Sequence, residues 1–353
     1  SKYRNRLPQL GDDLFLTDGG LETTLIFHER VPLPCFAAFD LLRDQTGTAM
    51  LRRYFERYAR IARTQERGLV LETPTWRANP DWGARLGYDA AALADANARS
   101  VGLLLEIRDA FESRRTPIVI SGNLGPRGDG YVPGTQMSAE QARAYHAPQV
   151  ELFAQTDADM VAGFTMNYPE EAIGIARAAK DAGMPVAISF TTETDGRLPS
   201  GLPLADAIAY TDDETAGHPE YYMINCIHPT HLAGALAESI GWQERVRGLR
   251  ANASRQSHAE LDASPDLDPG DPEELAAEYR ELHSAFRRLA VVGGCCGTDH
   301  RHVEAIGWAM PALAMQRQLP PADAMAASVL AQSSSASPGS SASGLQGASR
   351  LFS

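Results

Sequence analysis

Short apolar runs alternate with helix-like segments along most of this chain, and this alternation constrains the fold more than any other feature. Each run is followed by a loop richer in glycine and polar residues than the run itself. Continuous apolar runs of this kind are typical of buried parallel strands, and the segments between them repeat apolar residues at helical spacing. Eight strands are expected, near residues 14–17, 69–71, 117–120, 160–162, 186–190, 221–225, 246–249 and 289–292.

Eight strand–helix units predict an α/β protein with a single (β/α)8 TIM barrel, whose site lies on the loops at the C-terminal mouth of the strands. A doubly wound open sheet is the alternative, but no G-x-G-x-x-G follows the first strand to support dinucleotide binding. We expect the barrel to span residues 1–320 of the 353. Residues 321–353 are rich in Ser, Gly and Ala, bury little apolar surface and are expected to be a disordered tail.

Composition excludes several partners. A formal charge of −13 argues against a nucleic-acid surface. No apolar run reaches the roughly 20 residues that cross a bilayer, and the first residues lack the apolar core of a signal peptide. Four cysteines are too few for a disulfide framework in a chain of this size and fit thiols kept reduced. We therefore expect a cytoplasmic protein, monomeric or homo-oligomeric, with no nucleic-acid or membrane partner.

Two predicted strand ends carry cysteines. Cys226 follows the sixth strand, and Cys295 and Cys296 follow the eighth, within VVGGCCGTDHRH. Adjacent cysteines are poorly placed to bridge each other. Strands six and eight of a closed barrel are separated by one strand, so all three thiols can converge at the mouth. Three thiolates leave one position of a tetrahedral zinc ion open, which is more typical of catalytic than of structural zinc.

A zinc ion with three thiolate ligands carries a net negative charge and is poorly suited to activating water. It is better suited to binding an incoming thiol, lowering its pKa and holding it as a nucleophilic thiolate. Cys35 has no partner pattern and is expected to be packed. Four histidines lie close to the cysteines in sequence, but capping and rim hydrogen bonds explain them equally well: His228, His231, His300 and His302.

Six motifs spread over residues 12–310 resemble the zinc-dependent homocysteine S-methyltransferase family, which includes the betaine–homocysteine and S-methylmethionine–homocysteine enzymes. They are TDGGLETTL, GNLGP, SFT, INC, RANAS and GGCCGT, in that order, and GGCCG with an upstream N-C is the specific part. The resemblance implies zinc bound by Cys226, Cys295 and Cys296. It also implies methyl transfer from S-methylmethionine, S-adenosylmethionine or a betaine to the zinc-bound thiol of homocysteine or a related small thiol, as in methionine biosynthesis.

The resemblance also implies substrate contacts. Asp18, Gly19 and Gly20 match the segment that contacts the amino acid acceptor, Thr73 lies in the strand-two loop that lines the site, and Asn225 precedes the first zinc ligand. Asn252 matches the asparagine after strand seven. The polar segment that starts there, residues 252–272, is too long for an ordinary connection and is expected to be a lid or a partly ordered rim.

One position departs from the family pattern. Phe164 stands where the family carries a glutamate that holds the α-ammonium of the acceptor, and a phenylalanine cannot neutralise that charge. Either another carboxylate replaces the glutamate (Glu22, Glu72 or Glu193), or the acceptor is a different thiol. Phe164 can instead stack on a cationic donor. A barrel that binds zinc and a thiol without turnover, and a redox or hydrolytic barrel with a vicinal disulfide, remain as alternatives.

Overall fold

A computed structural model describes residues 1–238 and 241–311, and these form a closed barrel of eight parallel strands. Each strand pairs with the next in sequence, and the last pairs with the first. The expected (β/α)8 barrel is confirmed. The strands are β1 (Phe15–Leu16), β2 (Gly68–Glu72), β3 (Ile118–Leu124), β4 (Met160–Met166), β5 (Val186–Thr191), β6 (Tyr221–Asn225), β7 (Val246–Ala251) and β8 (Val291–Gly294).

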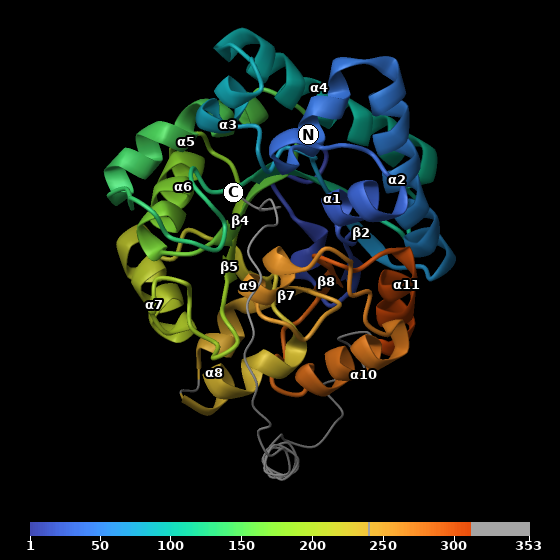
Figure 1. Cartoon of the computed structure of the whole chain (residues 1–353), viewed down its shortest axis with the longest axis vertical. Helices are drawn as coiled ribbons and strands as arrows, with labels where there is room; N and C mark the ends of the chain where they lie inside the picture. Colours follow the sequence, from blue (N-terminus) through green and yellow to red (C-terminus); the bar gives the residue numbers. More distant parts are fainter. Residues whose placement is uncertain (239–240, 312–353) are drawn as a thin grey trace.

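Helices that follow the strands surround the barrel (Figure 1). Amphipathic spacing explains the first: α2 begins after the capping carboxylate of Asp44 and turns Leu51, Tyr54, Phe55 and Tyr58 towards the strands. The helices of this layer are α2 (Gln45–Thr64), α4 (Ala90–Phe111), α5 (Ala139–Ala154), α6 (Pro169–Asp181), α7 (Leu204–Thr215), α8 (Leu232–Glu238), α10 (Pro272–Leu282) and α11 (His300–Ala309). Shorter helices lie in the loops: α1 (Leu21–Thr23), α3 (Pro80–Arg85) and α9 (His258–Ala263).

The barrel interior holds an apolar layer below a polar one. Because side chains alternate along a strand, residues two apart point to the same side. Val70, Val119 and Met223 belong to the interior cluster, and two residues further along each strand come Glu72, Ser121 and Asn225. A second and larger cluster fills the space between strands and helices. The polar layer therefore forms the floor of the mouth.

Several boundaries differ from expectation. β3 and β4 continue through glycine and polar residues to Leu124 and Met166, because backbone pairing does not require apolar side chains. Phe164 therefore lies inside β4 and not in the loop after it. After β1 the chain forms the short α1 and then a π-helical turn, Thr24–His28. The predicted tail, residues 321–353, and the end of the barrel domain at 320 lie outside the described residues.

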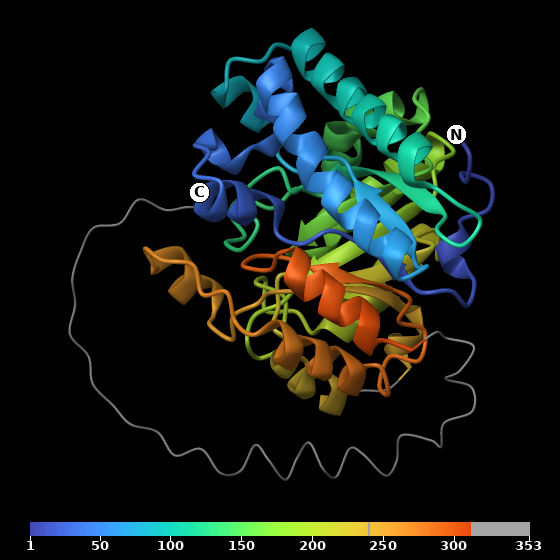
Figure 2. The same ribbon diagram turned by 90° about the vertical axis from the view of Figure 1, so that its right-hand side faces the viewer.

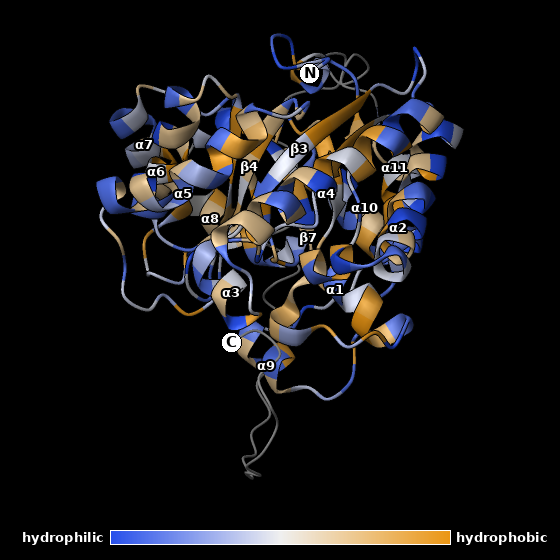
Figure 3. Cartoon of the chain, turned by 90° about the horizontal axis from the view of Figure 1, so that it is seen from above, coloured by the Kyte–Doolittle hydropathy of each residue, from blue (hydrophilic) through white to orange (hydrophobic). Residues whose placement is uncertain are grey.

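The segment 252–272 is ordered and carries α9, which projects from the barrel (Figure 2). Figure 3 places α9 and the N-terminus at opposite ends of the molecule. Two hydrogen bonds fix the base of the segment: Ala253 N donates to Cys296 O, and the side-chain Nε2 of His302 donates to Pro269 O. The base of the segment therefore lies against the cysteine loop, and a role as a lid stays a prediction. None of the described helices is long and apolar enough to span a bilayer.

Candidate active site

The three predicted ligands meet at the mouth of the barrel. Cys226 directly follows β6, and Cys295 and Cys296 directly follow β8. Their Sγ atoms all lie within 4.8 Å of one another, and the cysteines are free thiols without a disulfide. In a tetrahedral site with Zn–S bonds of about 2.3 Å, the sulfur atoms stand roughly 3.8 Å apart. The cluster therefore fits a zinc ion after small side-chain adjustments.

Asn225 positions this cluster through its side chain. Its Nδ2 donates to Cys226 Sγ (3.1 Å) and to Thr165 Oγ1 (3.0 Å), while its Oδ1 accepts from Thr165 N (3.0 Å) and Ser189 Oγ (2.6 Å). Thr165 and Cys226 both adopt positive φ, 61° and 56°. Left-handed backbone at two non-glycine residues costs energy and concentrates at functional sites. Asn225 bridges the two and holds both conformations.

Tyr131, from the loop between β3 and α5, reaches the thiols from the other side. Its hydroxyl donates to Cys226 Sγ at 3.2 Å and lies 3.9 Å from Cys296 Sγ. Burial disfavours a Cys226 thiolate, but hydrogen bonds from Cys295, Cys296, Tyr131 and Asn225 outweigh it and lower the Cys226 pKa well below its usual value. The pKa of Cys295 rises to about 12, mainly because it donates to Cys226. The chain thus favours anionic sulfur at Cys226.

A pocket beside the thiols is bounded by the loops after β1, β2 and β3 and by the polar layer of the barrel. We call it the inner pocket. Asp18 is buried there, pairs with Arg250 Nη2 (2.6 Å) and accepts from Tyr54 Oη (3.1 Å). The lining residues include Asp18, Gly19, Gly20, Glu22, Phe36, Glu72, Thr73, Trp76, Asn123, Tyr131, Phe164, Asn225, Arg250 and the three cysteines.

The glycines have a packing role that the sequence did not reveal. A Cβ at Gly20 would lie 2.6 Å from Cys295 O, and one at Gly19 would lie 3.0 Å from Thr298 O. Gly20 N also donates to Thr298 O at 3.0 Å. The loop after β1 therefore lies directly against the cysteine loop, and only glycine permits this approach.

Arg250 was missed by sequence reasoning, because an arginine inside RANAS carries no motif of its own. Its side chain is 91 % buried. Its Nε donates to Gly294 O at 3.0 Å, and its guanidinium lies 5.3 Å from the centre of the Phe164 ring. Phe164 thus contacts a cation that the protein itself supplies. This contact explains how an aromatic residue is accommodated at that position.

Of the three candidate carboxylates, two line the inner pocket and one does not. Glu22 and Glu72 are lining residues, and burial raises the pKa of Glu22 to about 7 and of Glu72 to about 8. Glu193 instead faces a separate outer cleft of 1270 Å³, where it lies 3.4 Å from His258 Nδ1. Glu193 therefore lies outside the inner pocket, unlike the other two carboxylates.

The remaining predicted residues divide between two pockets. Thr73 lines the inner pocket, and its hydroxyl accepts from Asn123 N at 2.8 Å. Asn252 is buried in a small pocket under α9, next to Cys296, and its Oδ1 has no hydrogen-bond partner. Among the described residues, the metal-like cluster contains no histidine. His228, for instance, bonds to Thr230 Oγ1.

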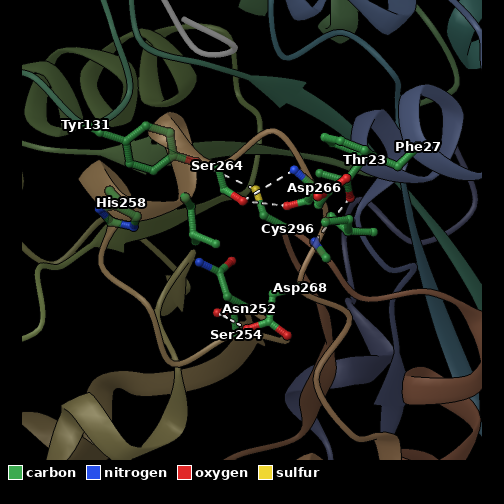
Figure 4. Close-up of a pocket in the computed structure, with 13 residues that line it drawn as sticks. Thr23, Phe27, Tyr131, Asn252, Ser254, His258, Ser264, Asp266, Asp268 and Cys296 are labelled. Carbon is green, nitrogen blue, oxygen red and sulfur yellow. Dashed lines mark hydrogen bonds between the residues drawn. The ribbon is translucent and has the colours of Figure 1, made fainter. Parts of the chain in front are cut away.

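The pocket under α9 joins the lid-like segment to the thiols (Figure 4). Tyr131 and His258 lie on one side of Cys296, and Thr23 and Phe27 come from the α1 region on the other. The His258 ring packs against Tyr131 in a tilted arrangement, with centroids 4.2 Å apart and an interplanar angle of 44°, and its Nε2 donates to Cys226 O. Neither Tyr131 nor His258 belongs to a recognisable motif, so sequence reasoning missed both.

Fold and site together define a TIM-barrel protein with three convergent thiols and an adjoining acidic pocket at the C-terminal mouth. A family model for homocysteine S-methyltransferase matches residues 15–310. The chain belongs to the homocysteine S-methyltransferase family and is an S-methyltransferase, as the resemblance implied.

Two curated relatives carry the same description. Homocysteine S-methyltransferase YbgG of Bacillus subtilis is 26% identical over 63% of this chain and 75% of its own length. Homocysteine S-methyltransferase of Escherichia coli is 27% identical over 66% of this chain and 77% of its own length.

Solved structures support the fold. The oxidized form of the homocysteine methyltransferase MmuM from Escherichia coli matches with a TM-score of 0.67 and 22% identity, over 86% of this chain and 98% of that one. The same protein has been crystallised in a metallated form, which matches with a TM-score of 0.62 and 21% identity over 85% and 97%.

Proposed function

We propose that this enzyme transfers a methyl group from a sulfonium or quaternary ammonium donor to homocysteine or a closely related amino thiol, at a zinc ion held by Cys226, Cys295 and Cys296. The convergence of three Sγ atoms within 4.8 Å of one another carries the proposal. When bound there, zinc would supply an open coordination position that lowers the pKa of the acceptor thiol and keeps it as a thiolate.

The residues of the chain perform the remaining tasks. Asn225 and Tyr131 donate to Cys226 Sγ and orient that ligand. The Asp18–Arg250 pair, Thr73 and the backbone of Gly19 and Gly20 shape the inner pocket for the acceptor. No general base is needed at the transferred methyl group, because the thiol proton leaves when the sulfur binds the metal.

Aromatic rings and carboxylates at the same mouth favour a cationic methyl donor. Phe36, Trp76 and Tyr131 line the inner pocket together with Glu22, and aromatic faces attract sulfonium and quaternary ammonium groups. S-methylmethionine, S-adenosylmethionine and a betaine are the donors to compare. A cytoplasmic location and a role in methionine biosynthesis remain predictions.

Metal analysis combined with a turnover screen tests the proposal. The purified protein should contain about one zinc per chain, and Cys226→Ala, Cys295→Ala and Cys296→Ala should each lower zinc content and methyl transfer together. Treatment with a chelator should abolish turnover, and added zinc should restore it. A metal-free protein that still methylates thiols would end this proposal.

A further inference from the structure

One buried carboxylate in the barrel has no cationic partner among the described residues. Glu72 ends β2 and is 4% exposed. Its Oε2 is buried without a hydrogen-bond partner in the described part of the chain, and Glu72 forms no ion pair there. A buried, unpaired carboxylate is costly, so most such groups have a partner. The buried Glu72 carboxylate is therefore a candidate to bind a cationic ligand.

The position of Glu72 indicates what kind of ligand it awaits. The carboxylate lines the inner pocket, and Ser121 is its register partner on β3. The Ser121 hydroxyl can donate to one carboxylate oxygen and lowers the pKa of Glu72, but it brings no positive charge. An ammonium group supplies what is missing, because it brings three N–H donors and a positive charge.

The neighbouring cation does not serve this purpose. Arg250 lies near enough to stabilise the charged form of Glu72, but it forms its ion pair with Asp18. Its Nε and Nη2 donate to Gly294 O, Asp18 Oδ1 and Gly19 O. The Asp18 carboxylate is thereby neutralised, whereas Glu72 keeps its capacity for an incoming cation.

Barrel topology separates Glu72 from the reacting sulfur. Glu72 lies on β2, opposite β6, which carries Cys226 at its end, and two strands from β8, which carries Cys295 and Cys296. The inner pocket contains both Glu72 and the three thiols, so an acceptor whose sulfur lies at the thiols keeps its ammonium, several bonds away, in the same pocket. S-methylmethionine and S-adenosylmethionine also carry an ammonium remote from their sulfonium, so the KM of the donor is measured beside that of the acceptor.

We propose that Glu72, with Ser121, is the ammonium-binding site for the amino thiol acceptor and decides specificity for thiols that carry an amine. This inference rests on the proposed function and assigns its acceptor specificity to residues of this chain. Glu22 is the competing carboxylate of the same pocket, but its side chain is less buried than that of Glu72.

The test compares two acceptors that differ only by the amine, homocysteine and 4-mercaptobutanoate, with zinc-loaded protein. Glu72→Gln keeps the shape and removes the charge. The KM for homocysteine should rise about 10- to 150-fold, as expected for the loss of a charged hydrogen bond, while the KM for 4-mercaptobutanoate should stay the same. Glu22→Gln removes the same charge elsewhere in the pocket and should not reproduce this discrimination. Glu244→Gln is the control for folding and zinc content, because Glu244 is exposed and precedes β7, at the end of the barrel opposite the mouth.

A stability measurement distinguishes a binding role from a structural one. Because Glu72 has no cationic partner among the described residues, Glu72→Leu should leave the midpoint of thermal unfolding unchanged or raise it, with normal zinc content. Equal KM changes for both thiols, or a lower midpoint, would overturn the assignment. A rise confined to the KM of the donor, or discrimination by Glu22→Gln, would overturn it as well. If the wild-type protein methylates neither thiol with any donor, the proposed function itself fails. This outcome differs from a failure of the Glu72 assignment, in which the wild type is active but the variants do not discriminate between the two thiols.

Discussion

Replacement of Asn225 by alanine is the sharpest test of how this barrel builds its thiol cluster. The change removes one side chain that makes four hydrogen bonds, two at Nδ2 and two at Oδ1. It leaves three buried groups without their partner: Thr165 N, Thr165 Oγ1 and Ser189 Oγ. Each such group costs about 1–3 kcal/mol, and rotation of the two hydroxyls recovers part, so the unfolding free energy should fall by about 3–5 kcal/mol.

The same substitution should also weaken metal binding. Without Asn225, nothing on β6 donates to Cys226 Sγ, and nothing bridges Cys226 to Thr165 to hold their positive φ values. Loss of a residue that orients a metal ligand typically lowers affinity about 10- to 100-fold. We expect a loss of that size for zinc, measured by competition with a chromophoric chelator. Stability is measured separately by urea unfolding of the metal-free protein.

Ser189→Ala is the matched control. It removes one of the four hydrogen bonds and leaves the contacts to Thr165 and Cys226 intact, so it should cost about 1 kcal/mol of unfolding free energy. Zinc affinity should be unchanged. If Asn225→Ala lowers stability no more than Ser189→Ala and binds zinc as tightly as the wild type, then Asn225 does not organise the site, and this reasoning is wrong.

Three further predictions follow from the structure. The homocysteine KM, divided by that for 4-mercaptobutanoate, should fall as pH rises from about 6 to about 8, because burial raises the Glu72 pKa to about 8 and only its ionised form binds an ammonium; a flat ratio would contradict this. The charged or titratable groups that face Glu72 are Arg250, Asp18 and Tyr221. Phe164→Glu should leave the preference for the amine unchanged, because Glu72 already binds the ammonium; stronger preference for homocysteine would show that Glu72 does not fill the role. Arg108→Ala should cost about 3–5 kcal/mol of unfolding free energy, because Asp159 is fully buried beside it; unchanged zinc content and KM values would separate this effect from the site, and an unaltered urea midpoint would refute it.

The sequence predicted the architecture because eight apolar runs are visible without any tertiary information. It predicted the convergence of Cys226, Cys295 and Cys296 because strand ends in a barrel share one face. Strand ends were harder to predict: β4 continues through Gly163 and Phe164, since pairing depends on the backbone. Phe164 was therefore placed in a loop.

The contacts that tune the site could not be predicted, because they join residues far apart in the chain. Tyr131 reaches Cys226 from 95 positions away, and Arg250 reaches Asp18 from 232. Nothing local marks either residue as functional. Glu72 was one of three candidate carboxylates, and it differs from Glu193 in its burial and in the pocket that it lines, neither of which the sequence shows.

The close contact between the loops after β1 and β8 has a consequence for recombination between relatives. Gly20 faces the Cys295 carbonyl so closely that any side chain there would displace the cysteine loop. A chimera that takes its first strand–loop unit from one parent and its last from another must therefore carry a compatible glycine pair to keep its thiols in place. The two ends of the barrel segment are inherited as one functional unit, although more than 270 residues separate them.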